Sequence, residues 1–362
     1  MRTTRMTRRH LIFLLALLVT VLAGVLIFAW YRHARLYTVT VLPRLGTRVV
    51  EPRAINDRGQ IVGFCQGRFY LWEAGKDWRE LGRASGRGLY LNNAGQIAGT
   101  VDDPNGAQRA FLWDPADGSR LLGAPGDISS EANAINNLGQ VVGVSKTPSG
   151  EEHGFIRDKP GGMCDLGLHY PWTINDRGEL IVFNYGQPLL MEASDIGFAA
   201  TEVPPVGKHY GNSFYCLNNN GYVFSEALNA DKGRMYDFFW RRDRSIEWLF
   251  PRGDQTIYTA VALNDANQIA VSERVLYSSW LKRFMKREPR PYKQSFLWTR
   301  QRGRVFLDKY VREHRGDYLS VAGLNNNGCI VGTVNRESGS LRQAVLLEPI
   351  PERWGKRGAG KR

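Results

Sequence analysis

The chain has 362 residues and 43% of them are apolar, which is enough to bury a core and excludes global disorder. Its formal net charge is +13, but residues 1–10, 274–294 and 352–362 carry +4, +6 and +4, and the rest is nearly neutral. The sequence therefore offers no basic stripe for a phosphate backbone, and we expect no nucleic-acid partner.

The N-terminal part predicts a membrane anchor. Residues 1–10 are a basic segment with four arginines, and the twenty residues from Leu11 to Trp30 carry no charge. At ~1.5 Å per residue a helix of this length spans a bilayer, and the positive-inside rule places the basic end in the cytoplasm. We predict a single-pass anchor over residues 11–31 and a segment 1–10 in the cytoplasm.

A cleaved signal peptide is the alternative to this anchor. Its apolar core normally has about 7–15 residues and ends in small residues. Here the run is longer and ends in the bulky Phe28, Trp30 and Tyr31. Both interpretations export the rest of the chain, so we expect it in the periplasm or outside the cell.

One motif recurs between residues 36 and 348. Its clearest copies are AINDRGQIVGF at 54–64 and AINNLGQVVGV at 134–144. The leading asparagines are Asn56, Asn92, Asn136, Asn175, Asn218, Asn264 and Asn325. Their spacings of 36 to 61 residues suit propeller blades or an array of helix pairs. Strands are favoured, because Asn-Asn/Asp-x-Gly between short β-branched runs is a hairpin signal.

The count of strands predicts a closed ring. Each motif is followed by a run such as AFLWD at 110–114, and six of the seven units continue with a further run such as MCDLG at 163–167. The seventh unit lacks this outer strand, whereas an unmatched strand stands at 37–46. Pairing it with 344–348 would remove the open edge. We predict an all-β, seven-bladed β-propeller closed by an N-terminal strand. The alternative, an open solenoid, should show polar caps that are not visible.

These motifs resemble the HAF-repeat family of exported bacterial proteins. Ala54 to Phe64, Ala110 to Trp113 and Asp165 to Gly167 match its pattern piecewise, and His153-Gly-Phe155 approaches its His-containing version. Two copies lose the Gly-Gln step, at Glu179 and Tyr222. The resemblance covers about residues 36–348. It implies a propeller fold and export, but no established chemistry.

No catalytic, cofactor-binding or metal-binding residues are predicted. Four cysteines without paired spacing exclude a CxxC zinc site, and we expect small, half-buried apolar residues, with disulfides left open. The histidines form no HExxH motif. One carboxylate per turn suits calcium poorly, so the turn motif predicts hairpin geometry. Trp72, Trp113, Trp240 and Trp298 share one repeat position, which favours packing between blades over sugar stacking.

An insertion at residues 274–294 produces the widest spacing. Leu276, Trp280 and Phe284 lie at helical intervals, with basic residues projecting largely elsewhere. A basic amphipathic helix indicates a membrane surface or an acidic partner. The candidate partner-binding residues are Trp280, Lys282, Arg283, Phe284, Lys286 and Arg287. The alternative is a solvated helix packed on the propeller.

Chain direction separates the two faces of the predicted propeller. The insertion joins the second and third strands of its blade, so it should lie on the face opposite the anchor, away from lipid. The basic tail, residues 349–362, leaves on the anchor's face, where anionic lipid would attract it.

Together these features predict a membrane-anchored extracytoplasmic propeller that acts as a binding or scaffold module for a protein or glycan partner. We expect no cofactor. The alternative is an exported carbohydrate-active hydrolase, lyase or isomerase with its site in the central channel. Asp, Glu, Arg or His side chains should then converge at one channel mouth.

Overall fold

The computed structural model describes residues 20–21, 36–86, 88–123, 126–158, 162–194, 197–202, 216–229, 234–241, 243, 245–251, 256–275, 292–314, 316–336 and 340–351. The chain divides into a large unit, Val39–Leu347, and a small one made of Met1–Thr38 and Glu348–Arg362. Most of the predicted anchor, residues 11–31, and of the tail, 349–362, lies outside the described residues. Within the described part of the chain, no helix has the length and apolar content needed to cross a membrane.

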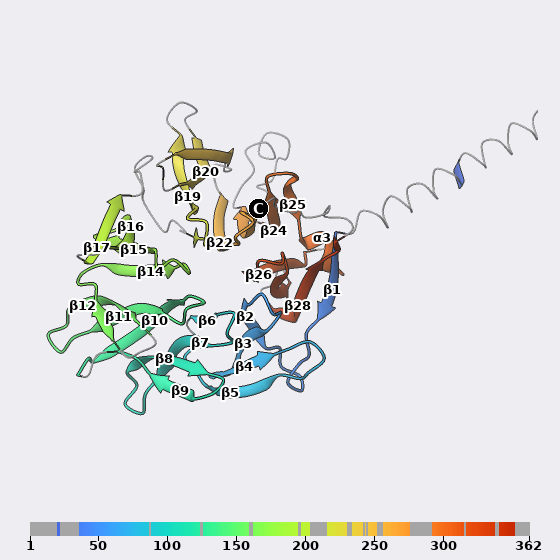
Figure 1. Cartoon of the computed structure of the whole chain (residues 1–362). Helices are drawn as coiled ribbons and strands as arrows, with labels where there is room; N and C mark the ends of the chain where they lie inside the picture. Colours follow the sequence, from blue (N-terminus) through green and yellow to red (C-terminus); the bar gives the residue numbers. More distant parts are fainter. Residues whose placement is uncertain are drawn as a thin grey trace, which may run out of the picture. The chain divides into compact units, whose positions relative to one another are not determined.

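Seven sheets of four strands form the blades of a propeller (Figure 1). Blade 1 contains β2 (Glu51–Ile55), β3 (Ile61–Cys65), β4 (Arg68–Trp72) and β5 (Arg79–Arg83). Blade 2 contains β6 (Leu89–Leu91), β7 (Ile97–Asp102), β8 (Gln108–Asp114) and β9 (Gly118–Leu121). Blade 3 contains β10 (Ser129–Ile135), β11 (Val141–Lys146), β12 (Glu152–Arg157) and β13 (Met163–Asp165). Blade 4 contains β14 (Tyr170–Ile174), β15 (Leu180–Asn184), β16 (Gln187–Ser194) and β17 (Gly197–Glu202).

The remaining blades follow the same order. Blade 5 contains β18 (Cys216–Leu217), β19 (Val223–Asn229), β20 (Arg234–Trp240) and β21 (Ile246–Pro251). Blade 6 contains β22 (Thr256–Leu263), β23 (Ile269–Val275), β24 (Tyr292–Thr299) and β25 (Gly303–Phe306). Blade 7 contains β26 (Tyr318–Leu324), β27 (Ile330–Asn335), β28 (Leu341–Pro349) and β1 (Tyr37–Val41). The prediction of an all-β, seven-bladed propeller is confirmed.

Blade 7 is completed by the N-terminal strand. Its sheet runs in the order β1-β28-β27-β26, so the first strand of the fold pairs with the last. Just beyond β1, the Leu42 N–H donates to the Ala344 carbonyl at 2.9 Å. The predicted closure is confirmed: β1 covers the edge that β28 would otherwise expose, and β1 becomes the outer strand of this blade.

The repeated asparagine builds each hairpin turn. In blade 1 the Asn56 side-chain oxygen accepts the backbone N–H groups of Arg58 at 3.1 Å and Gln60 at 2.9 Å. Gly59 then takes a φ of +76°, which costs glycine little. In blade 6 Asn267 occupies the glycine position with a φ of +57°. Asn tolerates this region better than most residues, so the turn survives the departure from the repeat.

The second strand of each blade is buried on both faces, because neighbouring blades cover it from either side. In β3, Ile61 and Val62 are fully buried, which explains the continuous apolar run. In blade 3 a glycine of the second strand, β11, allows close approach of the inner strand, β10. A Cβ on Gly143 would lie 2.1 Å from the Glu131 carbonyl oxygen.

The core consists of layers between blades. Phe69 of blade 1 packs on Phe111 of blade 2 with ring centroids 5.2 Å apart. The four tryptophans at the repeated position are all buried, with exposed fractions of 0–9%: Trp72, Trp113, Trp240 and Trp298. Their predicted role in packing between blades is confirmed.

Two local expectations need correction. Cys164 is exposed rather than half-buried, because it lies on the outer strand β13, and none of the four cysteines forms a disulfide in the structure. A short helix, α3 (Asp308–Val311), follows β25 and was not predicted. Four residues are too few to show helical periodicity. Asp308 stands at the position that Gly167 occupies in the outer run MCDLG of blade 3. Its carboxylate accepts the N–H groups of Ser295 and Leu319, both at 2.7 Å, and so joins blades 6 and 7.

Candidate functional site

A closed ring of seven asparagines surrounds the channel on the face that carries the turns. Each asparagine is 3–4% exposed, and its side-chain amide donates to the backbone carbonyl of the next one at 2.9–3.1 Å. The members in order are Asn56, Asn92, Asn136, Asn175, Asn218, Asn264 and Asn325. Asn325 donates to Asn56, so the turn motif also joins the blades.

A second ring is formed by the residues that follow these asparagines. The backbone N–H of each donates to the side-chain Oδ1 of the next at 2.7–2.8 Å. The members are Asp57, Asn93, Asn137, Asp176, Asn219, Asp265 and Asn326. The sequence predicts hairpin geometry alone for the turn motif. That prediction does not explain why the residue after each asparagine bonds to the next blade.

The three carboxylates of the second ring are occupied by amide donors. The second oxygen of Asp176 accepts the side-chain amides of Asn137 and Asn219, both at 2.8 Å. Asp57 and Asp265 accept neighbouring asparagine amides in the same way. These carboxylates are therefore structural acceptors rather than a free acid–base pair. The cavity they surround has a volume of about 200 Å³.

Below this mouth the channel becomes apolar and then widens. The seven residues before the asparagines are all Ile or Leu, and they line the mouth beneath the rings. A cavity of about 380 Å³ follows, lined among others by Tyr90, Asn133 and Trp172. Burial, with smaller effects of Tyr170 and Glu131, raises the pKa of Tyr90 to about 12. Like an ordinary tyrosine, it is protonated at neutral pH, and the raised pKa moves it further from acting as a base.

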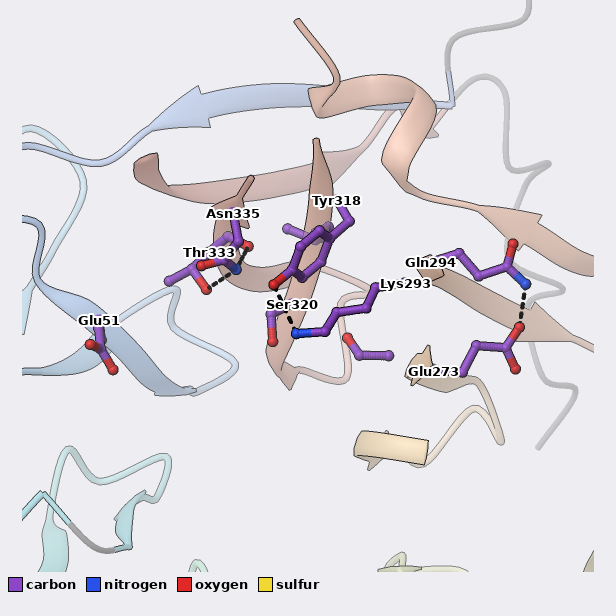
Figure 2. A pocket seen from close by; sticks show the side chains of 10 residues that line it. Glu51, Glu273, Lys293, Gln294, Tyr318, Ser320, Thr333 and Asn335 are labelled. Atoms are coloured by element: carbon purple, nitrogen blue, oxygen red, sulfur yellow. Dashed lines mark hydrogen bonds between the residues drawn. The ribbon is translucent and has the colours of Figure 1, made fainter. Parts of the chain in front are cut away.

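A third cavity, the blade 6–7 pocket, opens on the face opposite the turns (Figure 2). Its volume is about 290 Å³, just below the roughly 300–1,000 Å³ typical of small-molecule sites. The lining residues are Glu51, Ser272, Glu273, Lys293, Gln294, Tyr318, Leu319, Ser320, Thr333 and Asn335. They come from the ends of β23, β24, β26 and β27, and from the start of β2.

Lys293 and Tyr318 meet in the middle of this pocket. The Lys293 ammonium donates to the Tyr318 hydroxyl at 2.9 Å (Figure 2). On one side Gln294 donates to the carboxylate of Glu273, which is only 3% exposed. On the other side the Asn335 amide donates to Thr333 at 3.1 and 3.2 Å. Over the described ranges, no carboxylate lies within 4.0 Å of the Lys293 ammonium.

The predicted partner-binding residues Trp280, Lys282, Arg283, Phe284, Lys286 and Arg287 all lie outside the described residues. β23 extends to Val275 and β24 begins at Tyr292, so both ends of the 274–294 insertion are strand residues. Val275 and Tyr292 are register partners at the strand ends away from the Asn264 turn. The insertion therefore starts and ends beside the blade 6–7 pocket. Sequence reasoning missed this pocket, because no repeated motif contributes its charged residues.

The described residues contain no group of three His, Cys, Asp or Glu side chains placed to hold a metal ion. One His–Asp pair occurs, His153 and Asp165, with Nδ1 and Oδ2 2.9 Å apart. It joins β12 and β13 on the outer edge of blade 3, away from the channel. His153 and Asp165 thus contact each other across two neighbouring strands.

No protein-family model and no curated protein matches this chain. Solved structures of propellers do. A streptogramin B lyase is similar at a TM-score of 0.55 and 10% identity, covering 87% of this chain and 98% of that one. The virginiamycin B lyase from Staphylococcus aureus, in an inactive variant with quinupristin, has a TM-score of 0.53 at 11% identity, with 87% and 100% covered.

A third similar structure is the β-propeller domain of the Trilobed protease from Pyrococcus furiosus, described as having an open velcro topology. Its TM-score is 0.54 at 8% identity, covering 82% of this chain and 95% of that one. Identities this low show a shared propeller fold, and they carry no information on activity. In blade 7 of the present chain, by contrast, β1 pairs with β28.

Proposed function

We propose that this protein is an extracytoplasmic binding module, tethered to the cytoplasmic membrane by residues 11–31. It would present the propeller face opposite the turns to a partner, and the insertion 274–294 would form part of the contact. The proposal needs no cofactor and no catalytic residue.

The observation that carries this proposal is the distribution of charged groups over the two faces. At the turn mouth, Asp57, Asp176 and Asp265 are all engaged by amides of the ring. On the opposite face, the exposed Lys293 and the half-buried Glu51 line an open cavity at the base of the insertion. Groups able to meet a ligand therefore gather where the insertion starts and ends.

The tether rests on the sequence. The uncharged run from Leu11 to Trp30 follows four arginines, which supports an N-terminus inside and a propeller outside. The resemblance to exported HAF-repeat proteins supports the same orientation. Protease added to spheroplasts should degrade the propeller only if it lies outside the membrane, and a cytoplasmic marker protein should survive.

The alternative, a carbohydrate-active enzyme with its site in the channel, has less support. The carboxylates at the turn mouth act as acceptors within the rings, and the described channel lining adds Tyr90 with a raised pKa. General acid–base chemistry needs groups whose pKa values are tuned toward the working pH.

The register of blade 6 supplies a clean test. Because Val275 and Tyr292 are directly paired, residues 276–291 can be replaced by Asn-Gly, which favours a two-residue hairpin turn. Cross-linking in intact cells, followed by identification of the linked partner, should show a contact for the full chain and its loss in this variant. The matched control replaces residues 148–150 at the β11–β12 hairpin of blade 3 with Asn-Gly. Partner binding that survives removal of the insertion would contradict the proposal.

A further inference from the structure

Arg274 and Lys293 stand directly opposite each other on neighbouring strands of blade 6. They are register partners of β23 and β24. Side chains in this position have Cβ atoms about 5 Å apart, and like charges there destabilise a sheet. Among the residues that the structure describes, neither cation has a carboxylate within 4.0 Å. The blade therefore holds two neighbouring positive charges that no described acidic group neutralises.

This pair of cations lies on the face of blade 6 that packs on blade 7. Side chains alternate between the two faces of a strand, so Arg274 shares its face with Ser272. The Ser272 Oγ accepts the Val321 N–H of β26 at 2.7 Å, which turns that face toward blade 7. Accordingly, the Lys293 ammonium donates to the Tyr318 hydroxyl at 2.9 Å, in the middle of the blade 6–7 pocket (Figure 2).

The carboxylates of the pocket lining do not neutralise these cations. Glu273 and Gln294 are register partners one residue along each strand, so both project from the opposite face of the sheet. There Gln294 donates to the Glu273 carboxylate. Glu51 of blade 1 forms an ion pair with Arg53 at 3.0 Å. The blade 6 wall of the pocket therefore carries an excess of positive charge.

The blade 7 wall supplies uncharged donors. Tyr318 and Asn335 are register partners, as are Ser320 and Thr333, so all four side chains project from one face of the sheet and line the pocket. The Tyr318 hydroxyl accepts from Lys293 and keeps its own hydrogen to donate to a ligand. The ammonium also lies 4.7 Å from the centre of the Tyr318 ring, which helps to hold it in place. Cations and hydroxyl groups around one cavity suit a ligand with several acceptor oxygens.

From this geometry we infer that the blade 6–7 pocket binds the oxyanion group of a small ligand, a carboxylate or a phosphate. Lys293 and Arg274 would neutralise its charge, and the hydroxyl groups of blade 7 would donate to its oxygens. The inference rests on the proposed binding function and names the ligand class of that face.

The test is a binding measurement on the full chain in lauryldimethylamine oxide, a detergent without net charge at neutral pH. Calorimetry would use glucuronate and glucose 6-phosphate, which present a carboxylate and a phosphate on similar sugar rings, with glucose as the neutral counterpart. We expect at least one anion to bind, glucose not to bind, and anion binding to weaken as NaCl is raised, because salt screens the charges. The anion that binds more tightly identifies the group.

Two substitutions locate the site. Arg274→Gln and Lys293→Met should each weaken binding of the anion by roughly tenfold, the usual effect of losing a hydrogen bond to a charged group. Arg83→Gln and Lys309→Met are the matched controls, because they remove the same charges at exposed positions outside the pocket lining and should leave binding unchanged. Circular dichroism would verify that each variant folds.

Three results would overturn the inference: no binding of either anion at millimolar concentration, glucose binding as tightly as the anions, or anion binding unaffected by both substitutions. None of these results touches the tether or the insertion, which the spheroplast and cross-linking experiments address separately. A failed anion assay would therefore leave the proposed function standing.

Discussion

Asn267 of blade 6 accepts a hydrogen bond from the side-chain amide of Asn218 of blade 5 at 2.7 Å. In blades 1, 2, 3 and 6 the corresponding acceptor is the repeat's own glutamine, at 2.6–2.8 Å. Blade 5 has Tyr222 in place of that glutamine, and Asn267 stands where the other copies have glycine. Two departures from the repeat, in neighbouring blades, thus compensate for each other.

This compensation predicts energetic coupling between Tyr222 and Asn267. Asn267→Gly alone removes the acceptor from the buried Asn218 and should lower the free energy of unfolding by about 1 kcal/mol. Combined with Tyr222→Gln, which restores the usual acceptor, the loss should be largely recovered. A double-mutant cycle from chemical denaturation measures the coupling. Strictly additive effects would show that the two positions are independent.

The second ring predicts that its carboxylates are needed as acceptors. Asp176→Asn would turn an amide donor toward the donating amides of Asn137 and Asn219, and should destabilise the fold by ~1–3 kcal/mol. Asp117→Asn makes the same chemical change at an exposed turn of blade 2 and should be neutral. Thermal denaturation of the two variants decides the matter, and equal melting temperatures would contradict a structural role for the ring.

Gly143 lies so close to the inner strand of blade 3 that we expect no larger residue to fit there. A Cβ there would lie 2.1 Å from the Glu131 carbonyl and 2.7 Å from the Phe155 ring. Gly143→Ala should therefore force β10 and β11 apart and cost roughly 1–3 kcal/mol, as overpacking does. Gly162→Ala, where nothing lies within 4 Å of the added atom, is the control. Urea denaturation compares them, and equal midpoints would show that the strands yield easily.

The His153–Asp165 pair predicts a measurable pH dependence. The hydrogen bond to Asp165 and its charge raise the pKa of His153, so its NMR titration should have a midpoint above ~6.5. Because the folded-state pKa is raised, the pair's stabilisation is complete below the unfolded-state value and is lost as pH rises through the folded-state value. Asp165→Asn should bring the midpoint back, and an unchanged midpoint in that variant would refute the assignment.

The stabilisation from this pair at acidic pH depends on the pKa of Asp165. Burial opposes ionisation, but the hydrogen bonds from His153 and from the Gly167 N–H outweigh it and lower the pKa of Asp165. Its contribution is therefore present above the unfolded-state value and lost as pH falls through the folded-state value. The pair lies on an exposed strand edge, so its effect on stability should be small compared with the shift in titration.

The fold was predictable because the residue types of the repeat specify the turns and strands of each blade. Asn and Gly at fixed offsets specify the turn, the β-branched runs specify strands, and the unmatched strand at 37–46 specifies closure. The seven leading asparagines were identified as turn residues, but their bonds to the next blade were not. A signal for the second ring was present in the sequence, since the following residue is Asn or Asp in all seven copies.

The blade 6–7 pocket could not be predicted in the same way. Glu51, Glu273, Lys293 and Tyr318 stand at strand ends where the repeat has no fixed residue type. They line one cavity only because three blades converge, and neither spacing nor composition encodes that convergence in a single sequence. The insertion itself was visible as a widened spacing, although the strands extend into it from both sides.

The odd number of blades has a consequence for how such a molecule could gain or lose one. Seven positions cannot alternate strictly between acid and amide, so one like pair is unavoidable, and here it is the uncharged pair Asn93 and Asn137. Dropping the unit of Asn219 or Asn326 would set two carboxylates side by side. Dropping that of Asn93 or Asn137 would leave a perfectly alternating hexad. The second ring could therefore lose the blade of Asn93 or Asn137 without bringing two carboxylates together, whereas loss of the blade of Asn219 or Asn326 would do so.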